Sequence, residues 1–323
     1  MTKTLRIVFL GTPDFAVPSL GVLIENKYDV CAVITAPDKP SGRGLEIHQS
    51  PIKQFALTKE IKVMQPENLK DENFIAELKS LKADLFIVVA FRMLPKVVWD
   101  MPRLGTFNLH ASLLPQYRGA APINWAIING EKETGLTTFF LQQEIDTGSI
   151  ILQEKTTIEP DETAGELHDR LMILGSELVL KTVQHIGKGK YATIPQHNLI
   201  SSDTILRIAP KLFRDSCKID WNKGIDEIHD FIRGLSPYPG AWTELVSPMH
   251  NDYALKIFKS SKEIFPTSLP LGTILTDNKS QLKIVVKGGF ISILELQVPN
   301  RKRTGVAEFL KGYKVDGTWH IRS

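Results

Sequence analysis

The first 110 residues alternate short apolar runs with helical stretches, and this alternation narrows the folds open to the chain. The apolar runs are unbroken and rich in valine, isoleucine, leucine and phenylalanine, which is typical of parallel strands buried on both faces. A β-α-β rhythm of this kind predicts an α/β fold with an open, doubly wound, Rossmann-like and mostly parallel sheet. The expected strands are Leu5–Leu10, Val30–Thr35, Ala83–Ala90 and Gly105–His110, and the expected helices are Phe15–Glu25 and Asn73–Ser80.

The turn after the first expected strand excludes one common class of ligand. It reads LGTPDF from Leu10 to Phe15, with one glycine and with Pro13 two positions later. Dinucleotide-binding turns follow the pattern G-x-G-x-x-G, because the backbone must approach the pyrophosphate closely. We expect a tight turn into a helix here, and a nicotinamide-dependent oxidoreductase is disfavoured.

The C-terminal part of the chain has a different character. Residues 163–187 form the strongest expected helix, which opens with a capping box from Thr163 to Glu166. Residues 190–206 are rich in turn-forming residues and indicate a linker. Short strand segments with glycine and proline turns follow, and they predict a small, OB-like β-barrel. We expect a Rossmann-like domain over residues 1–189, a linker over 190–206 and a barrel domain over 207–323.

Charge is divided unequally along the chain. Residues 1–190 contain 21 Lys and Arg against 23 Asp and Glu, whereas residues 191–323 contain 18 against 13. An excess of positive charge in the C-terminal part is expected where that part faces a polyanion. No apolar run approaches the roughly 18 residues that cross a bilayer. The two cysteines lack metal-ligand spacing, so we expect a cytoplasmic protein with no metal.

The densest group of unusual residues lies between Phe107 and Ile127. Asn108 and His110 are two positions apart at the end of an expected strand, so their side chains point to the same face of the sheet. A second loop carries Asp146 before Thr-Gly. A carboxylate there can orient His110 or take a proton itself. Asp-Thr-Gly is also a common turn sequence, so a purely structural Asp146 stays open at this point.

These residues resemble a known family. Asn108, His110, the run SLLPQYRGAAPINWAI and the Asp146 loop are similar to motifs of the folate-dependent formyltransferases. Such enzymes transfer a one-carbon unit from 10-formyltetrahydrofolate to an amine. The segments RIVFLGTPDFAVPSL, PDKPSGRG, IDW and IRGLSPYPGAW are similar to those of members that act on methionyl-tRNA. The resemblance runs from Arg6 to Tyr313.

The resemblance implies an activity and its site residues. The activity is transfer of the formyl group of 10-formyltetrahydrofolate to the α-amino group of methionyl-initiator tRNA, for translation initiation. Asn108 and a protonated His110 would donate to the formyl oxygen, and Asp146 would fix the His110 ring and assist proton removal. No metal is implied, and we expect a monomer. Tetrahydrofolate would bind at Ser112, Leu113, Leu114 and Pro115.

The resemblance also implies contacts with tRNA. The loop from Ile34 to Lys53 would enter the acceptor stem, with Lys39, Arg43 and Lys53 as phosphate contacts. Leu45-Glu46 stands where many relatives carry two lysines, so either Lys39, Arg43 and Lys53 suffice for this contact or the C-terminal part supplies a larger share of the binding. Further candidates there are the triplet Arg301, Lys302 and Arg303 and a looser set of Lys211, Arg214, Lys218 and Lys223.

Several alternatives stay open from the sequence. A formyltransferase acting on a UDP-amino sugar and a 10-formyltetrahydrofolate hydrolase share the Asn-His-Asp set and the SLLP loop. The Gly-Arg-Gly loop and the basic C-terminal part favour tRNA over both. A non-catalytic RNA-binding module is disfavoured, since RNA binding alone does not require Asn108, His110 and Asp146.

Overall fold

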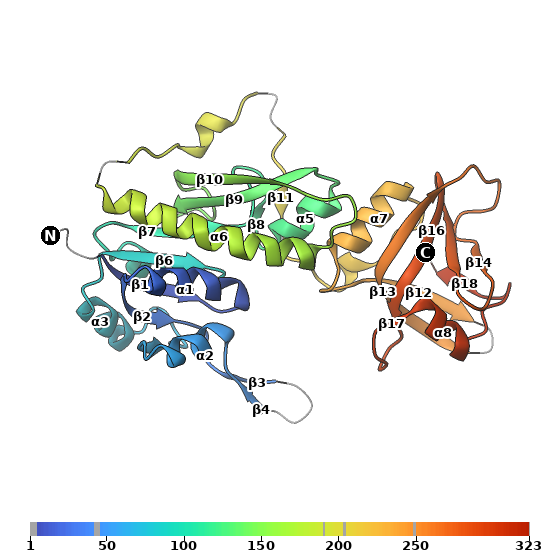
Figure 1. Ribbon diagram of the computed structural model, residues 1–323, viewed down its shortest axis with the longest axis horizontal. Helices are drawn as coiled ribbons and strands as arrows, with labels where there is room; N and C mark the ends of the chain where they lie inside the picture. The colour runs from blue at the N-terminus through green and yellow to red at the C-terminus, as the bar shows by residue number, and fades with distance from the viewer. Residues whose placement is uncertain (1–4, 42–45, 190, 203–204, 248–249, 323) are drawn as a thin grey trace. The chain divides into compact units, whose positions relative to one another are not determined.

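The computed structural model describes residues 5–41, 46–189, 191–202, 205–247 and 250–322 of the chain. These residues form two compact units. Figure 1 colours the chain by residue number. Unit 1 takes residues up to 119, 134–156 and 168–208, and unit 2 takes 120–133, 157–167 and 209 onward. The units are interleaved in sequence, whereas the expected domains are contiguous. The domain boundaries at residues 189 and 207 stay a prediction.

Unit 1 is built on a sheet whose described strands run in the order β10-β9-β7-β6-β1-β2-β5. The pairs from β5 through β2, β1 and β6 to β7 are parallel, and β9 pairs antiparallel with β7. The doubly wound, mostly parallel sheet is thus confirmed, with a strand at each of the four predicted places. The strands are β1 (Arg6–Gly11), β2 (Asp29–Ile34), β5 (Val63–Met64), β6 (Leu85–Val89), β7 (Thr106–His110), β9 (Glu133–Phe140) and β10 (Ile150–Thr157).

Helices cover both faces of this sheet. On one face, side chains of β1, β2 and β6 form a core with α3 and α4, in which Val88, Phe74 and Val98 are buried. On the other face, α6 packs directly on β7, since a Cβ at Gly175 would lie 2.8 Å from a methyl carbon of Leu109. The helices of unit 1 are η1 (Asp14–Ala16), α1 (Val17–Glu25), α2 (Pro51–Thr58), α3 (Glu72–Ser80), α4 (Lys96–Trp99) and α6 (Ala164–Gly187), whose first turn belongs to unit 2.

The glycine after β1 serves packing rather than phosphate binding. A Cβ at Gly11 would lie 2.7 Å from the Cβ of Ala16 and 3.1 Å from the carbonyl oxygen of Val89. The first helix can therefore approach the sheet only over a residue without a side chain. This explains why the turn needs one glycine and not the three of a dinucleotide site.

The start of α6 agrees with the sequence in detail. The Thr163 N–H donates to Oε2 of Glu166 at 2.8 Å, and the Glu166 N–H donates to Oγ1 of Thr163 at 3.3 Å. This is the predicted capping box, which satisfies two backbone donors at the helix end. Leu171 and Leu178 of this helix are buried.

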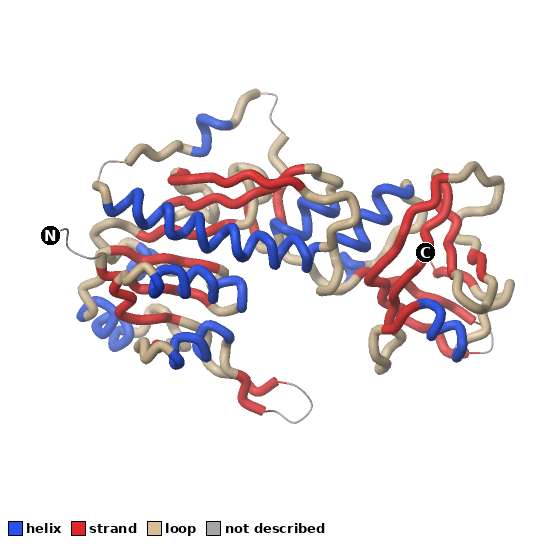
Figure 2. Tube along the Cα trace, in the orientation of Figure 1, coloured by secondary structure: helices blue, strands red, loops and turns tan. Residues whose placement is uncertain are grey.

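Unit 2 carries an antiparallel sheet whose described strands run in the order β14-β15-β16-β13-β12-β18, with β17 paired to β16. The sheet curls into a nearly closed, barrel-like form (Figure 2), which confirms the predicted small barrel. Its core packs Ile228 and Ile232 of α7 against Ile257 and Ile293 of the strands. The elements are α5 (Pro122–Ile128), η3 (Asp215–Cys217), α7 (Ile225–Gly234), β12 (Ala241–Ser247), β13 (His250–Ile264), β14 (Ile274–Thr276), β15 (Leu282–Val286), β16 (Gly289–Gln297), β17 (Thr304–Gly305), α8 (Val306–Gly312) and β18 (His320–Arg322).

Residues 191–202, expected to be a linker, are attached to unit 1. Ile194 forms an antiparallel bridge with Ile150 of β10, and Gln196 is only 2% exposed. No helix in the described ranges combines the length and the apolar character needed to cross a bilayer. The remaining short elements are β3 (Lys39–Ser41), β4 (Glu46–His48), β8 (Arg118–Gly119), η2 (Gln196–Leu199) and β11 (Ile208–Ala209).

Candidate active site

Asn108 and His110 lie on β7, close to the centre of the sheet of unit 1. Asn108 is in register with Val88 of β6 and with Phe139 of β9. Because Leu109 contacts α6, its two neighbours point to the opposite face. His110 is buried, whereas Asn108 is partly exposed. Within the described ranges the Asn108 amide has no hydrogen-bond partner, which leaves a free donor beside the imidazole.

The two ring nitrogens of His110 have different surroundings. Nε2 lies 2.9 Å from the carbonyl oxygen of Tyr117. A carbonyl oxygen only accepts, so Nε2 carries a proton and the neutral ring has its lone pair on Nδ1. Nδ1 lies 3.9 Å from Oδ2 of Asp146, which is too long for a hydrogen bond but close enough for electrostatic attraction.

The protonation state of His110 follows from its burial. Burial lowers the pKa of His110 below its ordinary value of 6.5, more strongly than the Asp146 carboxylate and the Tyr117 carbonyl raise it. A charged imidazolium is costly in a site that water does not reach. The ring is therefore neutral at pH 7, with Nδ1 free to accept a proton.

Asp146 is held by backbone contacts rather than by His110. Its φ is 54°, in the left-handed region, and its Oδ2 accepts a hydrogen bond from the Gly119 N–H at 3.0 Å. The loop approaches β9 so closely that a Cβ at Gly148 would lie 1.6 Å from the carbonyl oxygen of Phe140. Asp-Thr-Gly is thus a tight turn, and the same turn directs a carboxylate at His110.

Gln196 joins the two backbone segments that surround this pair. Its Nε2 donates to the carbonyl oxygens of Asp146 at 2.8 Å and Gly148 at 2.9 Å. Its Oε1 accepts from Nη2 of Arg118 at 2.6 Å, and Arg118 follows the residue whose carbonyl binds His110. The sequence analysis missed Gln196, because it lies in a polar stretch without periodicity or motif.

The Ser112–Pro115 loop is fixed by side chains of β9 and β10. Thr137 Oγ1 donates to the Ser112 carbonyl at 2.7 Å and accepts from the Leu114 N–H at 3.1 Å. Gln153 Nε2 donates to the Leu114 carbonyl at 2.9 Å. Ser112, Leu114 and Pro115 are buried, and Leu113 is half-buried. A ligand at this loop would therefore contact mainly its backbone.

The cations predicted to contact RNA in unit 1 differ in their surroundings. Arg43 and Leu45 lie outside the described residues. Lys39 is exposed on β3, and its ammonium has no partner in the part of the chain that the structure describes. Lys53 is different, because its side chain is only 14% exposed and its Nζ lies 2.5 Å from Oδ2 of Asp38.

The basic triplet of unit 2 lies between β16 and β17. Arg301 and Lys302 are exposed, and among the described residues neither side chain has a partner. Arg303 is engaged, since its Nε donates to Glu295 at 2.6 Å and its guanidinium lies over Phe258 at 4.6 Å.

The looser basic set lies beside aromatic rings and beside the acidic side chains of Glu227 and Glu244. Lys211 lies 5.5 Å from the ring centre of Phe213, and Arg214 and Lys218 lie 5.5 and 5.7 Å from that of Trp242.

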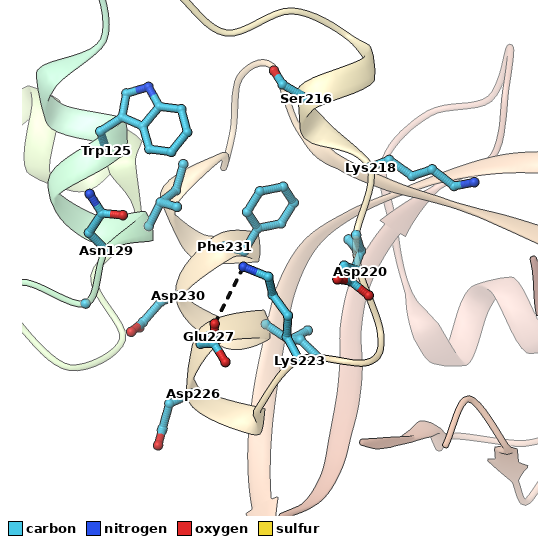
Figure 3. A pocket seen from close by; sticks show the side chains of 14 residues that line it. Trp125, Asn129, Ser216, Lys218, Asp220, Lys223, Asp226, Glu227, Asp230 and Phe231 are labelled. Carbon is cyan, nitrogen blue, oxygen red and sulfur yellow. Dashed lines mark ion pairs between the residues drawn. The ribbon is translucent and has the colours of Figure 1, made fainter. Parts of the chain in front are cut away.

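A hollow in unit 2 lies between α5, α7 and the segment from Ser216 to Lys223 (Figure 3). Two ion pairs involve residues that line this hollow, Lys223 with Glu227 at 3.5 Å and Asp230 with Arg233 at 2.7 Å. None of the residues predicted for catalysis or folate binding lines it. The candidate active site is therefore the group on β7 and its neighbouring loops in unit 1.

Comparison with known proteins identifies the family. Residues 5–183 match the family model described as formyl transferase, and residues 211–314 match the model for the formyl transferase C-terminal domain. The chain belongs to the formyl transferase family. The resemblance inferred from the motifs is thereby confirmed.

Relatives of this formyl transferase match it over nearly the whole chain. A methionyl-tRNA formyltransferase of Bacteroides thetaiotaomicron is 56% identical over 97% of each chain, and one of Flavobacterium johnsoniae is 54% identical over 96% of each. Among solved structures, the sugar 3N-formyl transferase WlaRD, determined in the presence of dTDP and 5-N-formyl-THF, has a TM-score of 0.64 at 25% identity. It covers 93% of this chain and 99% of its own.

HypX of Aquifex aeolicus, solved with tetrahydrofolic acid, shares the fold at a TM-score of 0.59 and 18% identity, over 99% of this chain and 51% of its own. The predicted fold class is therefore confirmed both by the sheet topology and by this family of structures. Among the described residues no group of three or more His, Cys, Asp or Glu side chains is arranged to hold a metal ion.

Proposed function

We propose that this formyl transferase moves the formyl group of 10-formyltetrahydrofolate to the α-amino group of methionyl-initiator tRNA, giving formylmethionyl-tRNA for translation initiation. The observation that carries the proposal is the 56% identity to a methionyl-tRNA formyltransferase along 97% of both chains. The sugar-modifying relative of known structure is only 25% identical. We further propose that the enzyme acts as a monomer in the bacterial cytoplasm, where initiator tRNA is used.

The side chains of Asn108 and His110 on β7 have the chemistry that formyl transfer requires. 10-Formyltetrahydrofolate supplies the one-carbon unit, and attack by an amine places negative charge on the formyl oxygen. The Asn108 amide has no partner among the described residues, so it can donate to that oxygen without breaking an existing bond. Removing one donor of this kind lowers the rate by about 10²–10³. We assign this role to Asn108.

We assign proton transfer to His110 and Asp146. The sequence led us to expect a protonated His110 that donates to the formyl oxygen. A buried, neutral ring whose Nε2 is bound to the Tyr117 carbonyl favours the opposite role, in which Nδ1 accepts the proton released by the attacking amine. Asp146, with Oδ2 at 3.9 Å, then stabilises the imidazolium that forms. Asp146 is in this view an electrostatic partner of the base.

We propose that folate and methionyl-tRNA bind to different parts of the chain around Asn108 and His110. Folate binds along the Ser112–Pro115 backbone, whose position is supported by the bonds from Thr137 and Gln153. The tRNA phosphates meet exposed cations, of which Lys39, Arg301 and Lys302 carry ammonium or guanidinium groups without a partner among the described residues. Each lost phosphate contact should reduce the salt dependence of binding by roughly one unit.

One experiment separates this function from its alternatives. The protein is incubated with 10-formyltetrahydrofolate and with methionyl-tRNA, free methionine, a UDP-amino sugar or no acceptor, and formyl incorporation is followed. We expect formylation of methionyl-tRNA alone. Formylation confined to the sugar, or release of formate without an acceptor, would overturn the proposal. Near-normal rates in Asn108→Ala or His110→Ala would instead refute the assigned site.

A further inference from the structure

The base of the β3–β4 hairpin contains an ionic cluster for which the proposed function gives no role. Lys53 Nζ lies 2.5 Å from Oδ2 of Asp38 and 2.7 Å from Oε1 of Gln65. Gln65 Nε2 donates to Oδ1 of Asp38 and to the carbonyl oxygen of Ala36, both at 2.8 Å. The ammonium, the carboxylate and the amide thus bond one another in a closed triangle.

The three residues come from three segments that meet where the hairpin leaves the sheet. Asp38 lies between β2 and β3, Lys53 lies in the first turn of α2, and Gln65 follows β5 directly. A second bond joins the same two ends of the hairpin, because Thr35 Oγ1 and Ser50 Oγ are 2.8 Å apart. Both ends are thereby fixed to each other and to the sheet, and β3 and β4 extend beyond them (Figure 1).

The surroundings of Lys53 are those of a structural cation. Its side chain is 14% exposed, and that of Asp38 is 22% exposed. Two of the three ammonium donors are used by Asp38 and Gln65. The hydrogen bonds from Lys53 and Gln65 lower the pKa of Asp38, so the carboxylate stays charged. Lys39 is the contrasting case, because it is exposed on the hairpin itself and has no partner among the described residues.

We propose that Asp38, Lys53 and Gln65 form a hairpin clamp that sets the direction of β3 and β4, and that Lys53 is a positioning residue for RNA binding rather than a phosphate contact. The inference rests on the proposed function, since it concerns how the hairpin meets methionyl-tRNA. It revises the role that the resemblance gave to Lys53 and leaves Lys39 as a phosphate contact. The clamp fixes where the Lys39 ammonium meets the RNA.

Asp38→Asn distinguishes the two roles of Lys53 by the sign of its effect. If Lys53 contacts phosphate, loss of the Asp38 charge frees its ammonium and lowers the KM for methionyl-tRNA. If the clamp positions the hairpin, that KM rises roughly tenfold, equivalent to the loss of one charge-assisted hydrogen bond, while the KM for 10-formyltetrahydrofolate is unchanged. Lys53→Met should raise the KM for methionyl-tRNA by a similar factor. The variant that combines Asp38→Asn and Lys53→Met should have a KM no higher than that of either single variant.

The salt dependence of RNA binding reports the number of phosphate contacts, and a loss of protein stability does not change it. Lys39→Met should reduce the slope of log affinity against log salt by roughly one, because one phosphate contact is lost. In the Lys39→Met background, Lys53→Met should leave the slope unchanged, because the clamp acts through the Lys39 contact that is already lost. A further reduction of the slope by roughly one in the double variant would show that Lys53 contacts phosphate itself and would overturn the clamp.

A matched control and a measurement without RNA complete the test. Lys96 of α4 and Asp100, which directly follows the helix, form an ion pair whose side chains are 67% and 58% exposed, and Asp100→Asn should leave both KM values unchanged. Hydrogen exchange of the β3 and β4 amides should be faster in Asp38→Asn than in wild type and unchanged in Asp100→Asn. If the wild type formylates no tRNA, the proposed function fails while the exchange still tests the clamp. Unchanged exchange in Asp38→Asn would overturn the clamp while leaving the proposed function intact.

Discussion

Replacing Gln196 by methionine tests whether the segment after α6 supports the catalytic group. Methionine matches glutamine in length but neither donates nor accepts a comparable hydrogen bond. The substitution removes the donor to the Asp146 and Gly148 carbonyls and the acceptor for Arg118. Gln196 is 2% exposed, so water does not readily replace these bonds. We expect Asp146 to move away from His110.

The expected loss of stability in Gln196→Met depends on how deeply the groups that lose their partner are buried. The bond to the Gly148 carbonyl is fully buried, and a buried group left without a partner costs about 1–3 kcal/mol. The Asp146 carbonyl and the Arg118 guanidinium are partly exposed, so each adds at most about 1 kcal/mol. The free energy of unfolding should fall by about 1–5 kcal/mol. A displacement of about 1 Å at a reacting group lowers the rate up to about 100-fold.

The assay is single-turnover formylation of methionyl-tRNA, with the free energy of unfolding measured by urea in parallel. We expect kcat to fall by about 10- to 100-fold with both KM values little changed. Gln142→Met is the matched control, because Gln142 is exposed in the same loop and bonds only the Thr147 side chain among described groups. In the Asp146→Asn background the Gln196→Met effect should shrink below about threefold. An undiminished effect there would refute a role through Asp146.

The other predictions concern protonation, packing and capping. The kcat of the wild type should fall as pH falls through a midpoint below 6.5, because a protonated His110 cannot accept a proton and its pKa is lowered by burial. Asp146→Asn removes the charge that raises this pKa, so the midpoint should move to still lower pH; a midpoint above 6.5 would contradict the assignment. Gly148→Ala places a Cβ 1.6 Å from the Phe140 carbonyl oxygen, so both melting temperature and kcat should fall. Thr163→Ala should lower the free energy of unfolding by about 1 kcal/mol in urea titrations, with kcat unchanged.

Much of the fold could be predicted because its signals are local. Unbroken apolar runs mark strands covered on both faces, and each of the four runs is a strand of the sheet in unit 1. The predicted capping box located the start of α6 from residues within one helix. The interleaving of the two units could not be predicted this way. It depends on how residues 120–133 and 157–167 pack against chain more than 40 residues away, and no local pattern encodes that choice.

In the candidate site, too, the local features could be predicted from the sequence and the non-local ones could not. The i, i+2 spacing of Asn108 and His110 on a strand is a local property, and the structure has both on the face opposite α6. Gln196 and the Tyr117 carbonyl were missed, because a glutamine in a polar stretch and a backbone oxygen carry no motif. For Lys53, the charge suggested a phosphate contact. The sequence shows that the residue is a cation, but only the folded structure shows that Asp38 lies within 2.5 Å of its ammonium.

The hydrogen bond from His110 Nε2 to the Tyr117 carbonyl oxygen limits which catalytic tasks His110 can perform. With that nitrogen bonded to Tyr117, the ring has one free position, Nδ1, which lies 3.9 Å from Oδ2 of Asp146 and can accept a proton. In the proposed mechanism, stabilisation of the formyl oxygen then falls to Asn108, whose amide does not titrate. The two proposed tasks are therefore assigned to neighbouring side chains of which only the His110 imidazole ionises near neutral pH. It follows that, of these two side chains, only His110 contributes to the acid limb of the rate profile, and that Asn108→Ala should lower kcat without moving its midpoint.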